Sequence, residues 1–377
     1  MWVRSDYPAP GSLAAVASSP SQIDLTWQDT APDESAYHVE RSPDGSSGWT
    51  EIDTVAADTT SYPDTGLDCG YPYHYRVRAY WSGDDQFSAY SSVASATTPL
   101  CETAKTLAPG WNLVSWAVAP PDPAVAAVLA SIEGLYCRVL SETGIHDCTL
   151  DPIYRTLNEL PGAAGFHLRL DSGSDADLQV QGYAIAADTP LPLEAGWNWA
   201  GYLPATALPI ETALAGIDGQ YDLVHSLNQT YIPGDPVYST LTHMEPGQGY
   251  LIHTTQATTL VYPSGAALAS ATGSRQEPAA CSGVSPTPAF TLVYGELMTG
   301  EDPAPLGTVV EVVTPRGEVA GCGTIRHEGQ YGYIHVYGED PSDPPLPGFR
   351  EGEPLAFRVN GVAATAGTEQ TWANDLT

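Results

Sequence analysis

The sequence predicts a mainly all-β protein, a multi-domain string of β-sandwiches around a duplicated β-rich middle unit that contains short helices. Its 377 residues leave room for about two to four independent cores. The chain has 36 glycines and 33 prolines but only 15% charged residues, which suits short strands joined by turns better than long helices. Alternating apolar residues near the start and a repeat in the middle add to this evidence.

Apolar residues alternate with other residues in three segments near the start of the chain. A period of two is typical of strands that bury one face. We therefore expect half-buried strands at three series of positions: Ile23, Leu25 and Trp27; Tyr37, Val39 and Arg41; and Tyr73, Tyr75 and Val77.

The same region resembles a fibronectin type III domain. The stretches IDLTW, YHVERS, TSYPDTGL and YPYHYRVRAYW resemble its B, C, E and F strands, in that order. Trp27 matches the buried tryptophan of strand B, Leu67 the leucine of the E to F turn, and Tyr73 the tyrosine-corner residue. The resemblance implies a fibronectin type III domain over residues 8–100, after an N-terminal extension at 1–7.

The middle of the chain contains a repeat with a period of about 85 residues. LAPGWNLVSW at 107–116 matches LEAGWNWAGY at 193–202, and three more pairs follow in order: IEGLY with IDGQY, DPIYRTL with DPVYSTL, and LPGAAGFHL with EPGQGYLIH. We expect repeat 1 at 101–183 and repeat 2 at 184–265. Because each copy buries only a modest core, the two should pack as one pseudo-symmetric unit, with Trp111 and Trp197 in equivalent buried positions.

Each repeat is expected to contain a short strand through its GWN turn, one short helix, such as 123–132, and a meander of strands. The pattern resembles the paired GWN repeats of secreted, multi-domain bacterial proteins, a resemblance that says little about function. Residues 266–288 are rich in small residues and proline, which predicts a linker. The following stretches FTLVYGE, GTVVEVVTP, YGYIHVYGED and LAFRVNG resemble a transthyretin-like or carboxypeptidase-regulatory β-sandwich over 289–377, here called the C-terminal module.

The six cysteines fall into near pairs, which predicts three disulfides. A zinc site is the weaker interpretation, because no C-x-x-C motif occurs and the paired residues are far apart in sequence. Disulfides imply an oxidising compartment, here an extracellular or cell-surface location. In the fibronectin type III topology the E to F turn and the end of strand G lie at one pole, which supports the first pair. The predicted pairs are Cys69 with Cys101, Cys137 with Cys148, and Cys281 with Cys322.

Charge and motifs exclude several function classes. The formal net charge of −32 would repel nucleic-acid phosphates, so no nucleic-acid partner is expected. No apolar run of about 18 residues occurs, so no direct membrane insertion is expected. The chain lacks a G-x-S-x-G elbow, an H-E-x-x-H motif and a phosphate-cradling glycine loop, which predicts no enzyme, no catalytic residue and no bound organic cofactor.

Two kinds of ligand have candidate residues. Asp171, Asp175 and Asp177 in DSGSDAD could supply oxygen ligands to calcium from one turn, although a solvated hairpin tip is the simpler interpretation. A glycan could stack on an exposed indole. With the other tryptophans assigned to cores, the freer candidates for such stacking are Trp49, Trp81 and Trp372.

These features favour a non-enzymatic, extracellular structural protein of a bacterial cell surface. In this interpretation the chain is a subunit of a filament, appendage or surface layer that assembles head to tail, with copies of itself or other surface proteins as partners. The alternative is a glycan-binding module or adhesin stalk within a larger secreted protein.

The end of the chain suggests a route to assembly. Domains that resemble the C-terminal module usually have one more strand after the segment at Trp372. Its absence would leave an open sheet edge beside Leu355, Phe357 and Val359, and Trp2 and Val3 of another copy could pair with that edge. The alternative, that the last strand was cut away from this sequence, stays open at this point.

Overall fold

The computed structural model describes residues 7–264, 281, 283–341 and 345–375, and nearly all of its regular elements are strands. This confirms the predicted all-β class. The chain divides into two compact units: the first comprises Met1–Glu102 with Gln181–Ala184, and the second comprises Thr103–Val180 with Ile185–Thr377. The predicted boundaries inside the second unit stay predictions, and most of the predicted linker lies outside the described residues.

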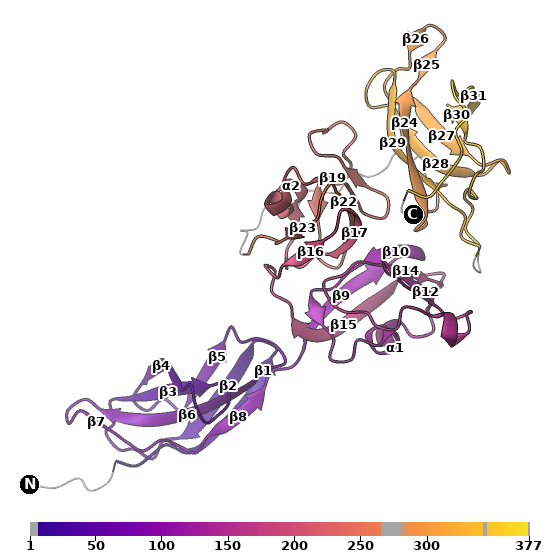
Figure 1. The fold of residues 1–377 in the computed structure, drawn as a ribbon. Coiled ribbons are helices and arrows are strands. Elements are labelled where there is room, and N and C mark those ends of the chain that lie inside the picture. Colours follow the sequence, from indigo (N-terminus) through magenta and orange to yellow (C-terminus); the bar gives the residue numbers. More distant parts are fainter. Residues whose placement is uncertain (1–6, 265–280, 282, 342–344, 376–377) are drawn as a thin grey trace, which may run out of the picture. The chain divides into compact units, whose positions relative to one another are not determined.

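The first unit is made of two antiparallel sheets (Figure 1). One sheet has the order β1 (Gly11–Ser19), β2 (Gln22–Gln28), β5 (Ser61–Thr65). The other has the order β4 (Thr50–Ala56), β3 (Ala36–Ser42), β6 (Pro72–Trp81), β7 (Gln86–Phe87), and β8 (Ala94–Thr97) also pairs with β6.

The core of this unit lies where the alternating apolar residues in the sequence predict it. Ile23, Leu25 and Trp27 all point from β2 into the core, and Trp27 is 5% exposed. Leu67 is also buried. Tyr73 is half-buried, and its hydroxyl accepts a hydrogen bond from the Asp68 backbone N–H at 2.9 Å. The loop before β6 is thereby tied to the strand by a tyrosine corner.

The two repeats of the second unit fold alike. Repeat 1 has a four-stranded sheet in the order β10 (Gly110–Val114), β14 (Phe166–Leu170), β12 (Tyr136–Leu140), β13 (Ile145–Asp147). Repeat 2 has the order β17 (Gly196–Gly201), β22 (Gly249–Thr254), β19 (Tyr221–His225), β20 (Thr230–Tyr231). The duplication in sequence is therefore a duplication of topology.

Short helices follow the first strand of each sheet, as the sequence predicts. They are α1 (Val125–Val128) with the 3-10 turn η1 (Ala130–Ile132), and α2 (Ile210–Ala213) with η3 (Ala215–Ile217). A further 3-10 turn, η2, spans Pro152–Tyr154 in repeat 1. Smaller sheets complete the repeats: β11 (Val118–Ala119), β15 (Ala176–Ala184) and β9 (Cys101–Leu107); β16 (Leu191–Leu193) and β23 (Thr258–Leu260); and β18 (Leu208–Pro209) and β21 (His243–Met244).

The C-terminal module contains a six-stranded antiparallel sheet (Figure 1). Its order is β24 (Phe290–Glu296), β29 (Gln330–Tyr337), β28 (Val319–Thr324), β27 (Val309–Val313), β30 (Ala356–Val359), β31 (Val362–Ala364), and β25 (Met298–Thr299) pairs separately with β26 (Asp302–Pro303). The likeness to transthyretin-like or carboxypeptidase-regulatory domains stays a prediction.

The predicted open edge beside Leu355, Phe357 and Val359 is wrong. The strand β30 that contains Phe357 and Val359 pairs on one side with β27 and on the other with β31, because the turn at 360–361 returns the chain alongside it. Leu355 and Phe357 pack against the core. Trp2 and Val3, the predicted donors of a strand, lie outside the described residues.

The last described residues cover the opposite edge of the sheet. The Asn374 side chain accepts a hydrogen bond from the Phe290 N–H, and the Asp375 carboxylate accepts one from the Leu292 N–H at 2.7 Å. Trp372 is 4% exposed and donates its indole N–H to the Val336 carbonyl at 2.8 Å. The segment that follows Trp372 thus caps the β24 edge, while β31 covers the edge that was expected to be open.

The structure contains three disulfides, and their pairing is the one read from the sequence: Cys69–Cys101, Cys137–Cys148 and Cys281–Cys322. The Cys137–Cys148 bond joins the two ends of the β12–β13 hairpin of repeat 1. The Cys281–Cys322 bond ties a residue that precedes the C-terminal module to strand β28 of that module.

We predict that Trp372→Ala lowers the free energy of unfolding by about 3–5 kcal/mol, because a buried indole and its hydrogen bond are both lost. Thermal and urea unfolding followed by circular dichroism would measure the loss. Val362→Ala is the matched control in the same module, since Val362 is 71% exposed. Equal unfolding curves for the two variants would contradict the assignment of Trp372 to the core.

Candidate functional site

The predicted calcium residues do not form one site. Asp171 pairs with Arg169, with 3.4 Å between the carboxylate and the guanidinium Nε. Asp177 accepts a hydrogen bond from the Thr106 hydroxyl at 2.7 Å. Asp175 is exposed. In the described part of the chain, Asp171, Asp175 and Asp177 are not among the groups whose ligand atoms converge.

The three tryptophans expected to be free for glycan stacking are already engaged, which corrects that expectation. Trp81 is buried and donates its indole N–H to the Pro32 carbonyl at 3.2 Å. Trp372 is buried as described above. The Trp49 ring is half-buried and lies against the Arg76 guanidinium, 4.3 Å from the ring centroid. These residues were misassigned because the partners of Trp81 and Trp372 lie far from them in the sequence.

Asp340 of the C-terminal module is the centre of a buried polar network with repeat 1. Its carboxylate is 4% exposed. It accepts hydrogen bonds from the Trp111 indole at 2.7 Å, the Arg138 guanidinium at 2.7 Å and the Arg169 guanidinium at 3.0 Å. Arg138 also pairs with Asp147 at 2.6 Å. We call Trp111, Arg138, Arg169 and Asp340 the Asp340 clamp.

The corresponding tryptophan of repeat 2 contacts the same module. Trp111 pairs across the sheet with Arg169, and Trp197 pairs with His253, so the two tryptophans occupy the same place in their repeats. The Trp197 indole donates to the Asp375 carbonyl at 2.9 Å. Trp111 is buried but Trp197 is half-buried, so the expected equal burial is not observed. Both GWN tryptophans serve as contacts to the C-terminal module.

Two histidines meet where repeat 2 packs on the C-terminal module. His225 Nδ1 and His335 Nε2 are 3.1 Å apart, and the Thr230 hydroxyl is 3.0 Å from His225 Nδ1. The Phe290 ring lies against both histidines. Burial lowers the pKa of His335 to about 4 and holds the pKa of His225 well below its usual value. The pair is therefore uncharged at neutral pH.

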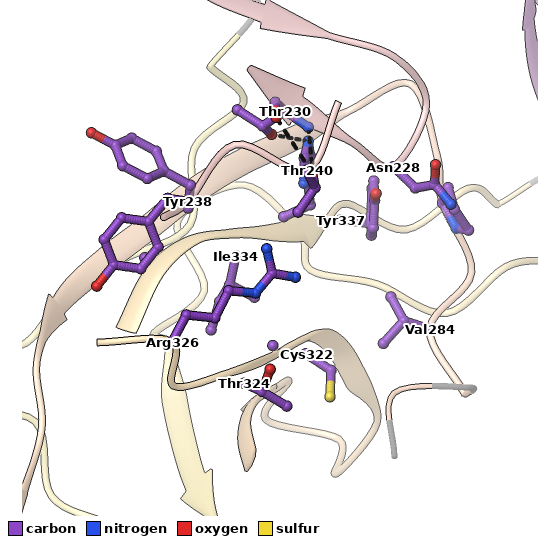
Figure 2. Close-up of a pocket in the computed structure, with 15 residues that line it drawn as sticks. Asn228, Thr230, Tyr238, Thr240, Val284, Cys322, Thr324, Arg326, Ile334 and Tyr337 are labelled. Atoms are coloured by element: carbon purple, nitrogen blue, oxygen red, sulfur yellow. Dashed lines mark hydrogen bonds between the residues drawn. The ribbon is translucent and has the colours of Figure 1, made fainter. Parts of the chain in front are cut away.

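A pocket of about 150 Å³ lies beside this histidine pair (Figure 2). Repeat 2 lines it with Asn228, Thr230 and Thr240, and the C-terminal module lines it with Thr324 and Arg326. Figure 2 shows the Arg326 guanidinium extending into the space between these groups. None of the residues that line the pocket is Asp or Glu. The polar groups it presents include hydroxyls, an amide and a guanidinium.

The topology of the first unit identifies its fold. Two antiparallel sheets enclose a core that contains Trp27 of β2, and the hydroxyl of Tyr73 makes a tyrosine corner. The first unit has a fibronectin type III-like fold. Its Cys69–Cys101 disulfide joins the turn that precedes β6 to the start of β9.

Comparisons with solved structures return fibronectin type III domains. An Fn3-like protein from Clostridium thermocellum is 34% identical in sequence, with a TM-score of 0.22; the match covers 26% of this chain and 100% of that one. The sixth fibronectin type III domain of the human fibronectin type III domain containing protein 3 is 19% identical, with a TM-score of 0.23; that match covers 26% of this chain and 91% of the other. No family model matches the chain, and no curated protein matches it.

The fibronectin type III-like unit contains a group of three carboxylates. Ligand oxygens of Asp29, Glu34 and Asp58 lie within 4.8 Å of one another. Glu34 is buried and accepts a hydrogen bond from the Asp58 backbone N–H at 2.8 Å, and Asp29 accepts one from the Ala31 N–H at 2.9 Å. Backbone N–H groups therefore already occupy part of the hydrogen-bonding capacity of these carboxylates. The sequence did not reveal it, because its members come from different loops.

Other residues of the site also escaped the sequence analysis. Arg138 and Asp340 are 202 residues apart, and no local pattern links them. One signal was available: the whole chain has 13 Lys and Arg residues, and Arg138 and Arg169 are both flanked by apolar residues, in CRVL and FHLRL of repeat 1. A scarce cation inside a strand indicates a buried acidic partner.

We predict that Asp340→Asn destabilises the second unit by about 3 kcal/mol, the lower end of the range for a broken buried ion pair, since both guanidinium groups lose the carboxylate they share while Arg138 keeps Asp147 and Arg169 keeps Asp171. Differential scanning calorimetry should show a lower melting temperature for the second unit and an unchanged one for the fibronectin type III-like unit. Asp302→Asn, at an exposed position of β26, is the control. An unchanged calorimetric profile for Asp340→Asn would contradict the role of the clamp.

The buried histidines predict a pH dependence of stability. Burial lowers the pKa of His167 to about 3 and that of His335 to about 4, whereas both titrate near 6.5 in the unfolded chain. The unfolded state therefore binds more protons below about pH 6.5, so stability is complete above that pH and falls as the pH drops toward 4. Each such histidine removes up to about 1.4 kcal/mol per pH unit in this window.

Urea unfolding measured from pH 7 to pH 4 would test this dependence. His335→Gln should reduce the slope of the free energy against pH, whatever its effect on stability at pH 7. The control is His327→Gln, at an exposed position. Equal slopes for the parent and His335→Gln would show that His335 does not contribute.

Proposed function

We propose that this chain is a non-enzymatic, extracellular structural protein of a bacterial cell surface, in which the second unit acts as a rigid block of a filament, appendage or surface layer. The Asp340 clamp is the observation that carries the proposal. A buried carboxylate shared by two arginines and an indole fixes the C-terminal module on repeat 1. A repeating assembly requires subunits whose modules keep the same positions relative to one another in every copy.

Covalent bracing and composition support an extracellular location. Three disulfides favour an oxidising compartment, and a net charge of −32 favours a solvated, soluble surface. Within the described residues no helix is both long enough and apolar enough to cross a membrane. The resemblance of the repeats to those of secreted bacterial proteins supports the bacterial assignment.

The two repeats differ at one loop in a way that supports self-association. In repeat 2 the loop Asp235–Tyr238 packs on the C-terminal module, where the Tyr238 hydroxyl donates to the Gln330 carbonyl at 3.3 Å. In repeat 1 the matching residues Ile153 and Tyr154 are 75% and 64% exposed. The loop that contacts a β-module in one repeat is therefore open to solvent in the other. We propose that a second copy of this chain covers Ile153 and Tyr154.

Sedimentation velocity and electron microscopy over a range of concentrations would test the assembly. We expect oligomers that grow with concentration, and we expect the double variant Ile153→Ser, Tyr154→Ser to remain monomeric. The variant Val362→Ser is the control, because it removes an equally exposed apolar side chain from the edge strand β31.

Two results would contradict the proposal. A parent chain that stays monomeric at every concentration would exclude assembly by this chain alone. Loss of assembly in Val362→Ser, with assembly retained in the double variant, would show that copies of the chain associate through the edge strand β31 and not through Ile153 and Tyr154.

A further inference from the structure

A further open pocket lies on the face of the C-terminal sheet; it adjoins the pocket in Figure 2 and shares Tyr238, Gly332 and Tyr333 with it. It has a volume of about 300 Å³, and we call it the tyrosine groove. Strands β24 and β29 supply Tyr294, Glu296, Gln330 and Tyr333, and the loop of repeat 2 supplies Asp235 and Tyr238. This volume is at the lower end of the range for small-molecule sites.

The aromatic rings of the groove form an ordered surface. The rings of Tyr294 and Tyr333 are stacked, with centroids 5.2 Å apart and planes inclined by 22°. The Tyr238 ring is tilted beside Tyr333, with 6.0 Å between centroids. Tyr294 is 66% exposed. Phenol rings thus line the groove with their positions fixed by one another, while one of them stays open to solvent.

The backbone of the groove is held in an unusual conformation. Tyr333 has a φ of +45°, which aromatic residues rarely adopt. The preceding residue is Gly332, where a Cβ atom would lie 2.3 Å from Cδ1 of Tyr238. Neither Tyr294 nor Tyr333 belongs to the hydrophobic core of the module. A strained tyrosine that the core does not use is typical of a ligand site.

The charges and hydrogen-bonding groups of the groove indicate which class of ligand it can bind. Glu296 and Asp235 bring negative charge to the groove, and the chain as a whole carries −32, so an anionic ligand would be repelled. Burial raises the pKa of Tyr238 and of Tyr333, which keeps both phenols protonated, and the Tyr238 hydroxyl already donates to the Gln330 carbonyl. Stacking surface together with carboxylate, amide and phenol groups matches a sugar ring, which has apolar C–H faces and a rim of hydroxyls.

We propose that the tyrosine groove binds a neutral saccharide. Tyr294 supplies the exposed ring on which the sugar stacks, and Tyr238 and Tyr333 enclose the groove beside it. The Glu296 carboxylate and the Gln330 amide accept or donate hydrogen bonds to sugar hydroxyls. A proline-rich peptide also binds to aromatic grooves, but it needs an extended surface, whereas this groove is compact. The inference does not depend on the proposed assembly.

Isothermal titration of the whole chain with a panel of probes would test the site. The panel contains neutral oligosaccharides of glucose, mannose and N-acetylglucosamine, an oligogalacturonate as the anionic probe, and a proline-rich peptide. We expect at least one neutral oligosaccharide to bind, and we expect Tyr294→Ala and Tyr333→Gly each to weaken its binding by about two- to ten-fold, the loss of one stacking contact. Glycine tolerates the positive φ at position 333, so that variant removes the ring without adding strain.

Tyr71→Ala is the matched control, because Tyr71 is a 47% exposed tyrosine of the first unit that belongs neither to the groove nor to the proposed assembly contact. It should bind the saccharide as the parent does. Absence of binding by every neutral probe would overturn the proposal, as would equal affinity in Tyr294→Ala or binding of the peptide alone. Sedimentation of the same variants separates this outcome from failure of the assembly, which depends on Ile153 and Tyr154.

Discussion

The structure of the second unit depends on one buried carboxylate. Asp340 is almost inaccessible to solvent, and a charge in such a place is tolerated only with close partners of opposite charge and well-placed hydrogen-bond donors. Arg138, Arg169 and Trp111 provide them, all from strands of repeat 1. Because these partners satisfy one another in a single geometry, the contact specifies how repeat 1 and the C-terminal module meet, in addition to whatever stability it contributes.

The duplication explains how one fold came to make two different contacts with the same module. Where repeat 1 has Arg169 opposite its GWN tryptophan, repeat 2 has His253, and Trp197 donates to a backbone carbonyl instead of a carboxylate. The neighbouring surface of repeat 2 is apolar and aromatic: Trp197 and Leu251 pack with Phe290 and Tyr337 of the C-terminal module. The repeats therefore share a backbone and differ in the side chains on one face.

Features with a local pattern could be predicted from the sequence. Two kinds of pattern were enough. Some features show within a short stretch of sequence: the alternation around Trp27, the tyrosine corner at Tyr73 and the near pairs of cysteines. The repeats show as four matched segments at a nearly constant spacing along the chain. Features that depend on partners far along the chain could not. Asp340 has no local motif, and the strand β31 is too short to be recognised, which is why the edge beside Phe357 was expected to be open. Trp372 was placed on the surface because nothing near it in sequence shows the strand it covers.

The central claim is that the Asp340 clamp makes the second unit one rigid body, and pulsed electron paramagnetic resonance tests it most directly. Spin labels at the exposed positions Ser174 of repeat 1 and Glu351 of the C-terminal module would report the distance between them. We predict a single narrow distance distribution for the parent chain and a broad one after Asp340→Asn. A broad distribution in the parent, or a narrow one that Asp340→Asn leaves unchanged, would contradict the account.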